Sequence, residues 1–88
     1  MRVVREIVIR NPQGLHARPA ALFVQIASKY NANITVQKDK EKVNGRSIMG
    51  ILTLGAQQNS KIILEANGND AEAAITELES LLTRQEIL

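Results

Sequence analysis

The chain changes from loop to helix at the stretch GLHARP, Gly14–Pro19. The residues just before it, Asn11–Gln13, have the sequence NPQ, which is typical of a loop. The segment that follows is apolar and rich in alanine, and proline is tolerated in the first turn of a helix, where backbone N–H groups have no intrahelical partner. We therefore predict that His16 lies where a loop becomes a helix, next to unpaired N–H groups.

His16 is the candidate functional residue, because it is the only histidine of the 88 residues. The N-terminal end of a helix carries partial positive charge and attracts anions. Arg18 adds a fixed cation that suits phosphate. A nucleophilic imidazole next to an anion site has what transient phosphorylation requires. The alternative is that His16 and Arg18 are ordinary residues of a helix start, where proline is common.

The composition predicts one small aliphatic domain, residues 1–88. Apolar residues make up 44% of the chain, and the only aromatic residues are Phe23 and Tyr30. So few aromatic side chains argue against a protein that stacks on single-stranded nucleic acid. The net charge of +2 comes from basic residues spread along the chain, which argues against a DNA-reading helix. We expect no nucleic-acid partner.

The sequence also gives no sign of a metal site, a disulfide bond or a membrane-spanning segment. There are no cysteines, which suits a reducing compartment, and a single histidine cannot build a zinc site. Glu6 interrupts the apolar run that a signal peptide would need near the start. No apolar run reaches the length that spans a membrane. We expect a cytoplasmic protein that does not associate with a membrane and binds no metal or cofactor.

The hydrophobic pattern predicts the order β-α-β-β-α-β-α. Alternating or β-branched runs predict strands at residues 3–9, 34–37, 42–44 and 61–66, and apolar residues at helical spacing predict helices at 17–30, 47–54 and from about 70 to 82. Asn69 and Glu72 have the spacing of a capping box for the last helix. The short connection between the second and third strands implies a hairpin. We predict an α+β fold, a two-layer open-faced β-sandwich whose four-stranded, mainly antiparallel sheet is covered on one face by three helices.

The segment Ser47–Leu54 is predicted to be a helix with Ser47 near its N-cap. Gly50 weakens this prediction, and a buried strand is the alternative that the apolar run permits. A short helix presses only one face on the core. Ile51 and Leu54 share one face, so part of the remaining apolar surface should stay exposed and mark a partner site. That surface comprises Ile48, Met49 and Leu52.

Two stretches, Gly14–Ala20 and Val43–Leu52, together resemble the HPr family, the histidine-containing phosphocarrier proteins of the bacterial phosphoenolpyruvate-dependent phosphotransferase system. The resemblance runs over almost the whole chain. It implies a covalent phosphoryl carrier rather than an enzyme. By this resemblance, His16 accepts a phosphoryl group from phospho-enzyme I and passes it to enzyme IIA domains in sugar uptake. Arg18 matches the active-site arginine that stabilises the phosphate.

The resemblance also implies a regulatory site and a docking surface. Ser47 matches the serine that an ATP-dependent HPr kinase/phosphorylase modifies, although Arg46 stands where many family members have lysine. The partner-binding surface implied for enzyme I and the enzyme IIA domains consists of Ala21, Gln25, Ser28, Ile48, Met49 and Leu52. A monomer is expected.

Three alternatives remain open. The first is a paralogous carrier of a regulatory, nitrogen-type phosphotransferase branch, which would share the chemistry of His16 without sugar transport. The second is a non-catalytic regulatory or nucleic-acid-binding module of similar form, against which the few basic and aromatic residues argue. The third is a variant of the family that has lost the histidine and works through its serine, against which the presence of His16 argues.

Overall fold

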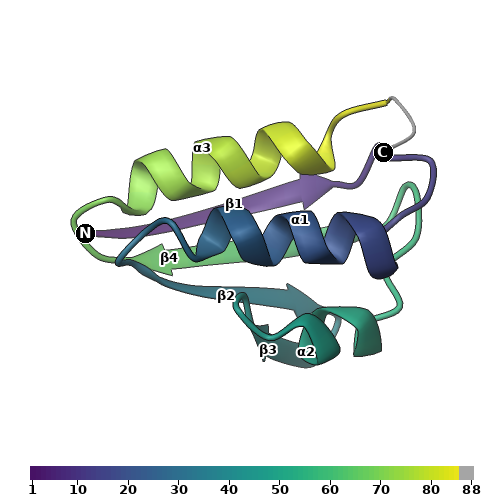
Figure 1. The fold of residues 1–88 in the computed structure, drawn as a ribbon, viewed down its shortest axis with the longest axis horizontal. Coiled ribbons are helices and arrows are strands. Elements are labelled where there is room, and N and C mark those ends of the chain that lie inside the picture. The colour runs from purple at the N-terminus through teal and green to yellow at the C-terminus, as the bar shows by residue number, and fades with distance from the viewer. Residues whose placement is uncertain (86–88) are drawn as a thin grey trace.

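A computed structural model of the chain, which describes residues 1–85, consists of one antiparallel sheet and three helices (Figure 1). The predicted order of elements is confirmed: β1 Arg2–Val8, α1 Ala17–Ala27, β2 Asn33–Lys38, β3 Glu41–Asn44, α2 Ile48–Thr53, β4 Lys61–Asn67 and α3 Ala71–Leu82. The strands lie in the order β1-β4-β2-β3, and every neighbouring pair is antiparallel. The helices lie on one face of the sheet, as an open-faced sandwich requires.

The alternation along the strands decides which face is covered. In β4, Ile62, Leu64 and Ala66 are buried, whereas Lys61 and Ile63 are exposed. Successive side chains of a strand point to opposite faces, so the buried set packs under the helices and the other set forms an open face. The core is aliphatic except for Phe23, which is fully buried. Among the described residues, no helix is long and apolar enough to cross a bilayer.

The first helix ends earlier than the sequence predicts. The apolar pattern extends to Tyr30, but α1 ends at Ala27 with Ser28 as its C-cap. The next amides bond only three residues back, Lys29 N–H to Ile26 and Tyr30 N–H to Ala27. The chain then turns into β2, so the prediction of a helix to Tyr30 was wrong.

The predicted capping box at Asn69 is also wrong. The N-cap of α3 is Asp70, and its side chain makes no bond to its own helix. Its carboxylate accepts the backbone N–H groups of Asn31 (2.8 Å) and Ala32 (2.9 Å) in the loop after α1. The bond from Asn31, followed by the bond from Ala32, lowers the pKa of Asp70 against the opposing effect of burial. Asp70 therefore joins the α1–β2 loop to the start of α3, which explains where α1 stops.

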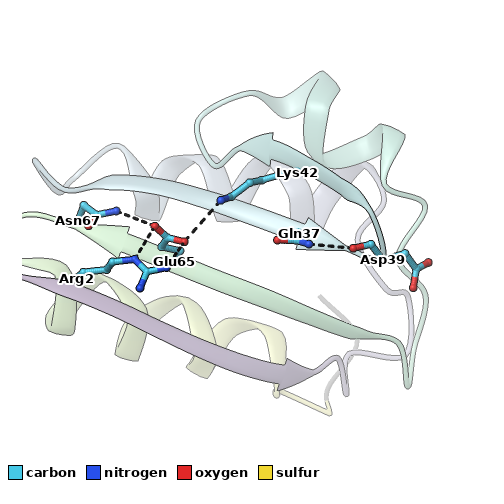
Figure 2. Close-up of polar contacts among 6 residues, drawn as sticks. All are labelled: Arg2, Gln37, Asp39, Lys42, Glu65 and Asn67. Atoms are coloured by element: carbon cyan, nitrogen blue, oxygen red, sulfur yellow. Dashed lines mark hydrogen bonds and ion pairs between the residues drawn. The ribbon is translucent and has the colours of Figure 1, made fainter.

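Glu65 organises the charges on the open face of the sheet (Figure 2). Its carboxylate accepts Arg2 Nε on β1 at 3.1 Å and Asn67 Nδ2 at 3.0 Å, and it lies 3.7 Å from Lys42 Nζ on β3. These contacts, chiefly the hydrogen bond from Arg2, lower the pKa of Glu65 from 4.5 to about 2. One carboxylate on β4 thus interacts with both outer strands.

We predict that the free energy of unfolding of Glu65→Gln falls less steeply with decreasing pH than that of the wild type. Because the pKa of Glu65 is depressed in the folded protein, the carboxylate stabilises the fold above about pH 4.5, and this contribution is lost as the pH falls toward 2. Urea unfolding followed by circular dichroism at a series of pH values should show wild type and variant converging over this window. Arg2→Gln, which removes the main cause of the shift, should act in the same direction. Parallel pH profiles for wild type and Glu65→Gln would contradict the prediction.

Candidate functional site

His16 occupies the N-cap of α1, as the sequence predicts. Its backbone is extended (φ −102°, ψ −162°), its side chain makes no capping bond, and its residue is exposed. The first helical bond runs from Ala20 N–H to the His16 carbonyl at 2.9 Å. The N–H groups of Ala17 and Arg18 therefore have no acceptor within the helix, and Pro19 has no N–H. The imidazole lies beside two backbone donors that no side-chain cap occupies.

Arg18 is exposed in the first turn of the same helix. Within residues 1–85 its guanidinium makes no ion pair and no hydrogen bond with another side chain. An arginine without such a partner keeps all its donors for an anion. The structure thus brings the imidazole of His16, a cation and two backbone donors to one exposed end of α1.

The loop before His16 is held by a close backbone contact. Gly14 has φ +65°, and a Cβ atom there would lie 2.6 Å from the Ala56 carbonyl oxygen and 2.8 Å from Gln57 Cα. The next residue, the buried Leu15, donates its N–H to the same Ala56 carbonyl at 2.8 Å. Only glycine permits this approach. The α2–β4 loop therefore fixes the position from which α1 starts.

Asn11 holds the other end of this loop, a role that the sequence analysis missed. It is the one buried polar residue of the described core (1% exposed). Its Oδ1 accepts Gln13 N–H at 3.1 Å, its carbonyl accepts Gly14 N–H at 3.0 Å, and its own N–H reaches the Leu82 carbonyl at the end of α3. The Asn-Pro pair signals the turn, but the contact with α3 has no local signal.

The second helix presents the apolar surface that the sequence predicts. Ile51 is fully buried, whereas Ile48 is 39% exposed and Met49 is 67% exposed. Leu52 is half-buried and lines a depression of about 560 Å³ together with His16. Of the predicted docking residues on α2, Leu52 therefore lies in the same depression as His16. The other residues around this depression are Pro12, Gln13, Leu15 and Gly55–Gln58.

The remaining predicted docking residues lie on α1 and at its C-cap, Ser28. Ala21, Gln25 and Ser28 are spaced by four and three residues, so they share one face of the helix. Ala21 is half-buried, and Gln25 and Ser28 are exposed. α1 packs against α2, so the two helices that carry the predicted docking residues are neighbours.

Ser47 is the N-cap of α2, in agreement with the sequence prediction. Its Oγ accepts the Gly50 N–H at 3.0 Å. The guanidinium of the preceding Arg46 donates hydrogen bonds to the Tyr30 carbonyl and, at 3.2 Å, to the Ala32 carbonyl. Arg46 thus joins the start of α2 to the α1–β2 loop. Within the described residues, no cluster of three histidine or acidic side chains is placed to hold a metal ion.

We predict that Gly14→Ala destabilises the protein more than Gly55→Ala does. Both glycines have a positive φ, +65° and +59°, but a Cβ at Gly55 would meet no atom within 4 Å. Gly55→Ala therefore measures the backbone strain alone, roughly 1 kcal/mol, and Gly14→Ala adds the clash with Ala56 and Gln57. The free energy of unfolding in urea gives the comparison. Equal losses for the two variants would show that the close contact is unimportant.

The chain is similar to known proteins over nearly its whole length. The family model described as "PTS HPr component phosphorylation site" matches residues 3–84. The chain is 39% identical over 83 residues to the HPr-like protein Crh of Halalkalibacterium halodurans, covering 94% of this chain and 99% of that one. It is 40% identical over 79 residues to the phosphocarrier protein HPr of Treponema pallidum, covering 90% of each.

A solved structure agrees with these sequence matches. The crystal structure of HPr-C-His from Thermoanaerobacter tengcongensis is 50% identical and superposes with a TM-score of 0.91, covering 98% of this chain and 99% of that one. The family model matches nearly the whole chain, and the fold is the same at high sequence identity. Together these findings show membership of a family and not only a shared fold. The protein belongs to the HPr family, whose members are phosphocarriers of the phosphotransferase system rather than catalytic enzymes.

Proposed function

We propose that His16 is the phosphoryl acceptor and donor of a carrier that takes a phosphoryl group from phospho-enzyme I and passes it to enzyme IIA domains in phosphoenolpyruvate-dependent sugar uptake. The observation that carries the proposal is the exposed imidazole at the N-cap of α1, beside two unused backbone donors and Arg18. Residues 1–88 act as one domain in this role.

The transfer follows from that geometry. A neutral ring nitrogen of His16 attacks phosphorus, a P–N bond forms, and the bond from phosphorus to the donor side chain of enzyme I breaks. The N–H groups of Ala17 and Arg18 and the Arg18 guanidinium receive the phosphoryl oxygens. The same steps in the opposite sense deliver the group to the next protein. Because phosphoryl transfer depends mainly on positioning and electrostatics, the partner's active site completes the geometry around an exposed histidine.

The surface beside His16 serves as the docking site for enzyme I and the enzyme IIA domains. The exposed Ile48 and Met49 and the half-buried Leu52 provide an apolar centre. Ala21, Gln25 and Ser28 on α1 extend it with small and polar side chains. An apolar centre with a polar rim suits a short-lived complex, which a carrier needs because it must leave one partner to reach the next.

Ser47 is the proposed regulatory site, modified by an HPr kinase/phosphorylase. A phosphate at this N-cap keeps oxygen atoms that can accept the Gly50 N–H, so the helix need not unfold. The added charge would instead lie next to Ile48 and Met49 and repel an acidic partner surface. Arg46 is already committed to two carbonyl groups, which limits its capacity to neutralise that charge.

We propose that the carrier works in the cytoplasm and as a monomer. The alternative, a carrier of a nitrogen-type regulatory branch, shares the chemistry of His16 and differs in the partners that it meets. Relatives named both HPr and HPr-like protein Crh match the chain at similar identity. Assays with enzyme I and separate enzyme IIA domains of the sugar and nitrogen branches distinguish the two functions.

We predict an acid-labile phosphate on His16 after incubation with phosphoenolpyruvate and enzyme I. His16→Ala should take up no such phosphate, whereas Ser47→Ala should take it up normally. Arg18→Ala should still be phosphorylated but about tenfold or more slowly, because a charge-assisted hydrogen bond contributes roughly 1.5–3 kcal/mol. Radiolabelled phosphate stable at alkaline pH and lost in acid is the measurement. Full labelling of His16→Ala would exclude the proposed site.

We predict that Ser47→Asp slows phosphoryl transfer from enzyme I without unfolding the domain. Ser47→Ala is the matched control, because it removes the capping oxygen, at a cost of about 1 kcal/mol, without adding charge. Stopped-flow transfer rates should fall for Ser47→Asp and stay near wild type for Ser47→Ala, while circular dichroism shows both variants folded. Equal rates for Ser47→Asp and wild type would refute a role for charge at this position.

A further inference from the structure

A second depression, of about 360 Å³, lies where β2 and β3 meet the segment that leads into α2. It is lined by residues 33–35 of β2, residues 42–44 of β3 and Arg46. The depression beside His16 is lined by other parts of the chain, and the two have no lining residue in common. The second depression is therefore separate from the proposed carrier site.

The pairing of β2 with β3 brings polar side chains together at this depression. In β2 the side chains that alternate with the buried ones, Asn33 and Thr35, point to the open face. Thr35 pairs with Asn44 of β3, so these two side chains are neighbours on that face. Lys42 lies two residues before Asn44 on the same face, and Figure 2 shows its side chain reaching from β3 toward Glu65 on β4. Side chains of both strands therefore line the depression from the open face.

Several hydrogen-bond donors around the depression are unused within residues 1–85. Lys42 Nζ lies 3.7 Å from Glu65 Oε1, which is too far for a hydrogen bond. Arg46 uses only Nη2 for its bonds to backbone carbonyls, so Nε and Nη1 keep their donors. Asn44 accepts the Arg46 backbone N–H through Oδ1 at 2.8 Å, which leaves the two donors of its Nδ2. A ligand with several acceptor oxygens would satisfy these groups.

The charges around the depression favour an anion. Glu65 is already paired with Arg2 at 3.1 Å. Asp70 is close enough to Arg46 for the guanidinium to be one of the causes that lower its pKa, but its carboxylate already accepts two backbone N–H groups of the α1–β2 loop. Three cations, including Lys42, thus stand against two carboxylates, and this part of the surface keeps a net positive charge.

Thr35 points to a polar ligand independently of these charges. Its Oγ1 is the one buried side-chain polar atom of the described residues that has no hydrogen-bond partner. A buried hydroxyl without a partner is unfavourable, and most such groups in native proteins are paired. Because Thr35 lines the depression, rotation about its χ1 to another staggered position would direct the hydroxyl toward a ligand.

We propose that this depression binds a small metabolite that carries a phosphate ester and hydroxyl groups. Lys42 and Arg46 bind the phosphate, for which the lysine point charge and the arginine fork are both suited. The amides of Asn33 and Asn44 bind hydroxyl groups of the same ligand, and the Thr35 hydroxyl adds a further bond. A carboxylate offers two oxygens to these donors, whereas a phosphate ester offers three. The volume of the depression lies at the lower end of the range of small-molecule sites.

This binding does not depend on phosphorylation of His16. Arg46 directly precedes Ser47 in the chain, so the ligand would lie close to the start of α2. Inorganic phosphate is also a ligand expected for the donors of Ala17 and Arg18, and the test must therefore tell the two sites apart residue by residue.

The first test is an NMR titration of the full chain at constant ionic strength with ribose 5-phosphate, inorganic phosphate, succinate and ribose. Ribose 5-phosphate should shift the side-chain NH2 signals of Asn33 and Asn44 and the Nε–H signal of Arg46 saturably, with a dissociation constant of about 1 mM. Inorganic phosphate and succinate, which lack hydroxyl groups, should bind there more weakly, and ribose should not bind. The backbone N–H signals of Ala17 and Arg18 report on the site at α1. Shifts that do not saturate, shifts confined to Ala17 and Arg18, or tighter binding of succinate would overturn the proposal.

The second test removes one charge. Lys42→Gln should bind ribose 5-phosphate about tenfold more weakly than the wild type, because a charge-assisted hydrogen bond is lost. Lys40→Gln is the matched control: it removes the same charge from an exposed position in the β2–β3 turn, outside the depression, and should bind like the wild type. Circular dichroism checks that both variants are folded. Unchanged binding by Lys42→Gln, or an equal loss in both variants, would exclude a specific site.

The third test uses the unpaired hydroxyl. Without ligand, Thr35→Val should have a free energy of unfolding in urea equal to or higher than that of the wild type, because the hydroxyl has no partner to lose. With ribose 5-phosphate at about 10 mM it should gain less stability than the wild type, because the gain depends on affinity. Thr53→Val is the control, since Thr53 Oγ1 donates to the Gly50 carbonyl at 2.6 Å outside the depression; it should lose stability without ligand and keep the full gain. If Thr35→Val gains as much stability as the wild type, the proposal is overturned.

Discussion

The position of His16 depends on the contact between Gly14–Leu15 and Ala56–Gln57. At this point two loops approach so closely that a Cβ on Gly14 would overlap backbone atoms, and Leu15 N–H bonds to the Ala56 carbonyl. One loop leads into α1 and the other leaves α2. The same contact therefore sets the start of the helix that carries His16 and places it close to α2, which carries the exposed apolar side chains. Asn11 adds a third anchor at the end of α3, so all three helices take part in positioning one exposed imidazole.

Local patterns in the sequence were enough to predict most of the fold and the N-cap positions of His16 and Ser47. The alternation in β4, the loop-to-helix change at Gly14–Pro19 and the excess of apolar residues in α2 each depend on neighbours within a few positions. What failed involved contacts between distant segments. The end of α1 depends on Asp70, some 40 residues away, and the same bonds take Asp70 away from its own helix. The burial of Asn11 depends on Leu82. Periodicity and capping rules cannot represent such contacts.

The two residues proposed for phosphorylation are both helix N-caps, but they use that position differently. Ser47 binds the Gly50 N–H through its Oγ, so the side chain already stabilises the start of α2. The His16 side chain makes no such bond, which leaves the backbone donors of α1 for a ligand. A phosphate on Ser47 would take over an existing structural contact, whereas a phosphate on His16 would use donors that no side-chain cap occupies. This difference fits the roles proposed for the two residues, a stable regulatory phosphate on Ser47 and a transferable phosphoryl group on His16.

A carrier must also avoid binding its phosphoryl group too tightly, and the sequence of α1 limits the number of donors. A typical helix start offers several free N–H groups to an anion. Here the third position of the helix is Pro19, which has none, so the first turn contributes the N–H groups of Ala17 and Arg18. The Arg18 guanidinium is exposed, and water screens its attraction for phosphate. The proline in the first turn of α1 thus limits how tightly the proposed site would hold a phosphoryl group.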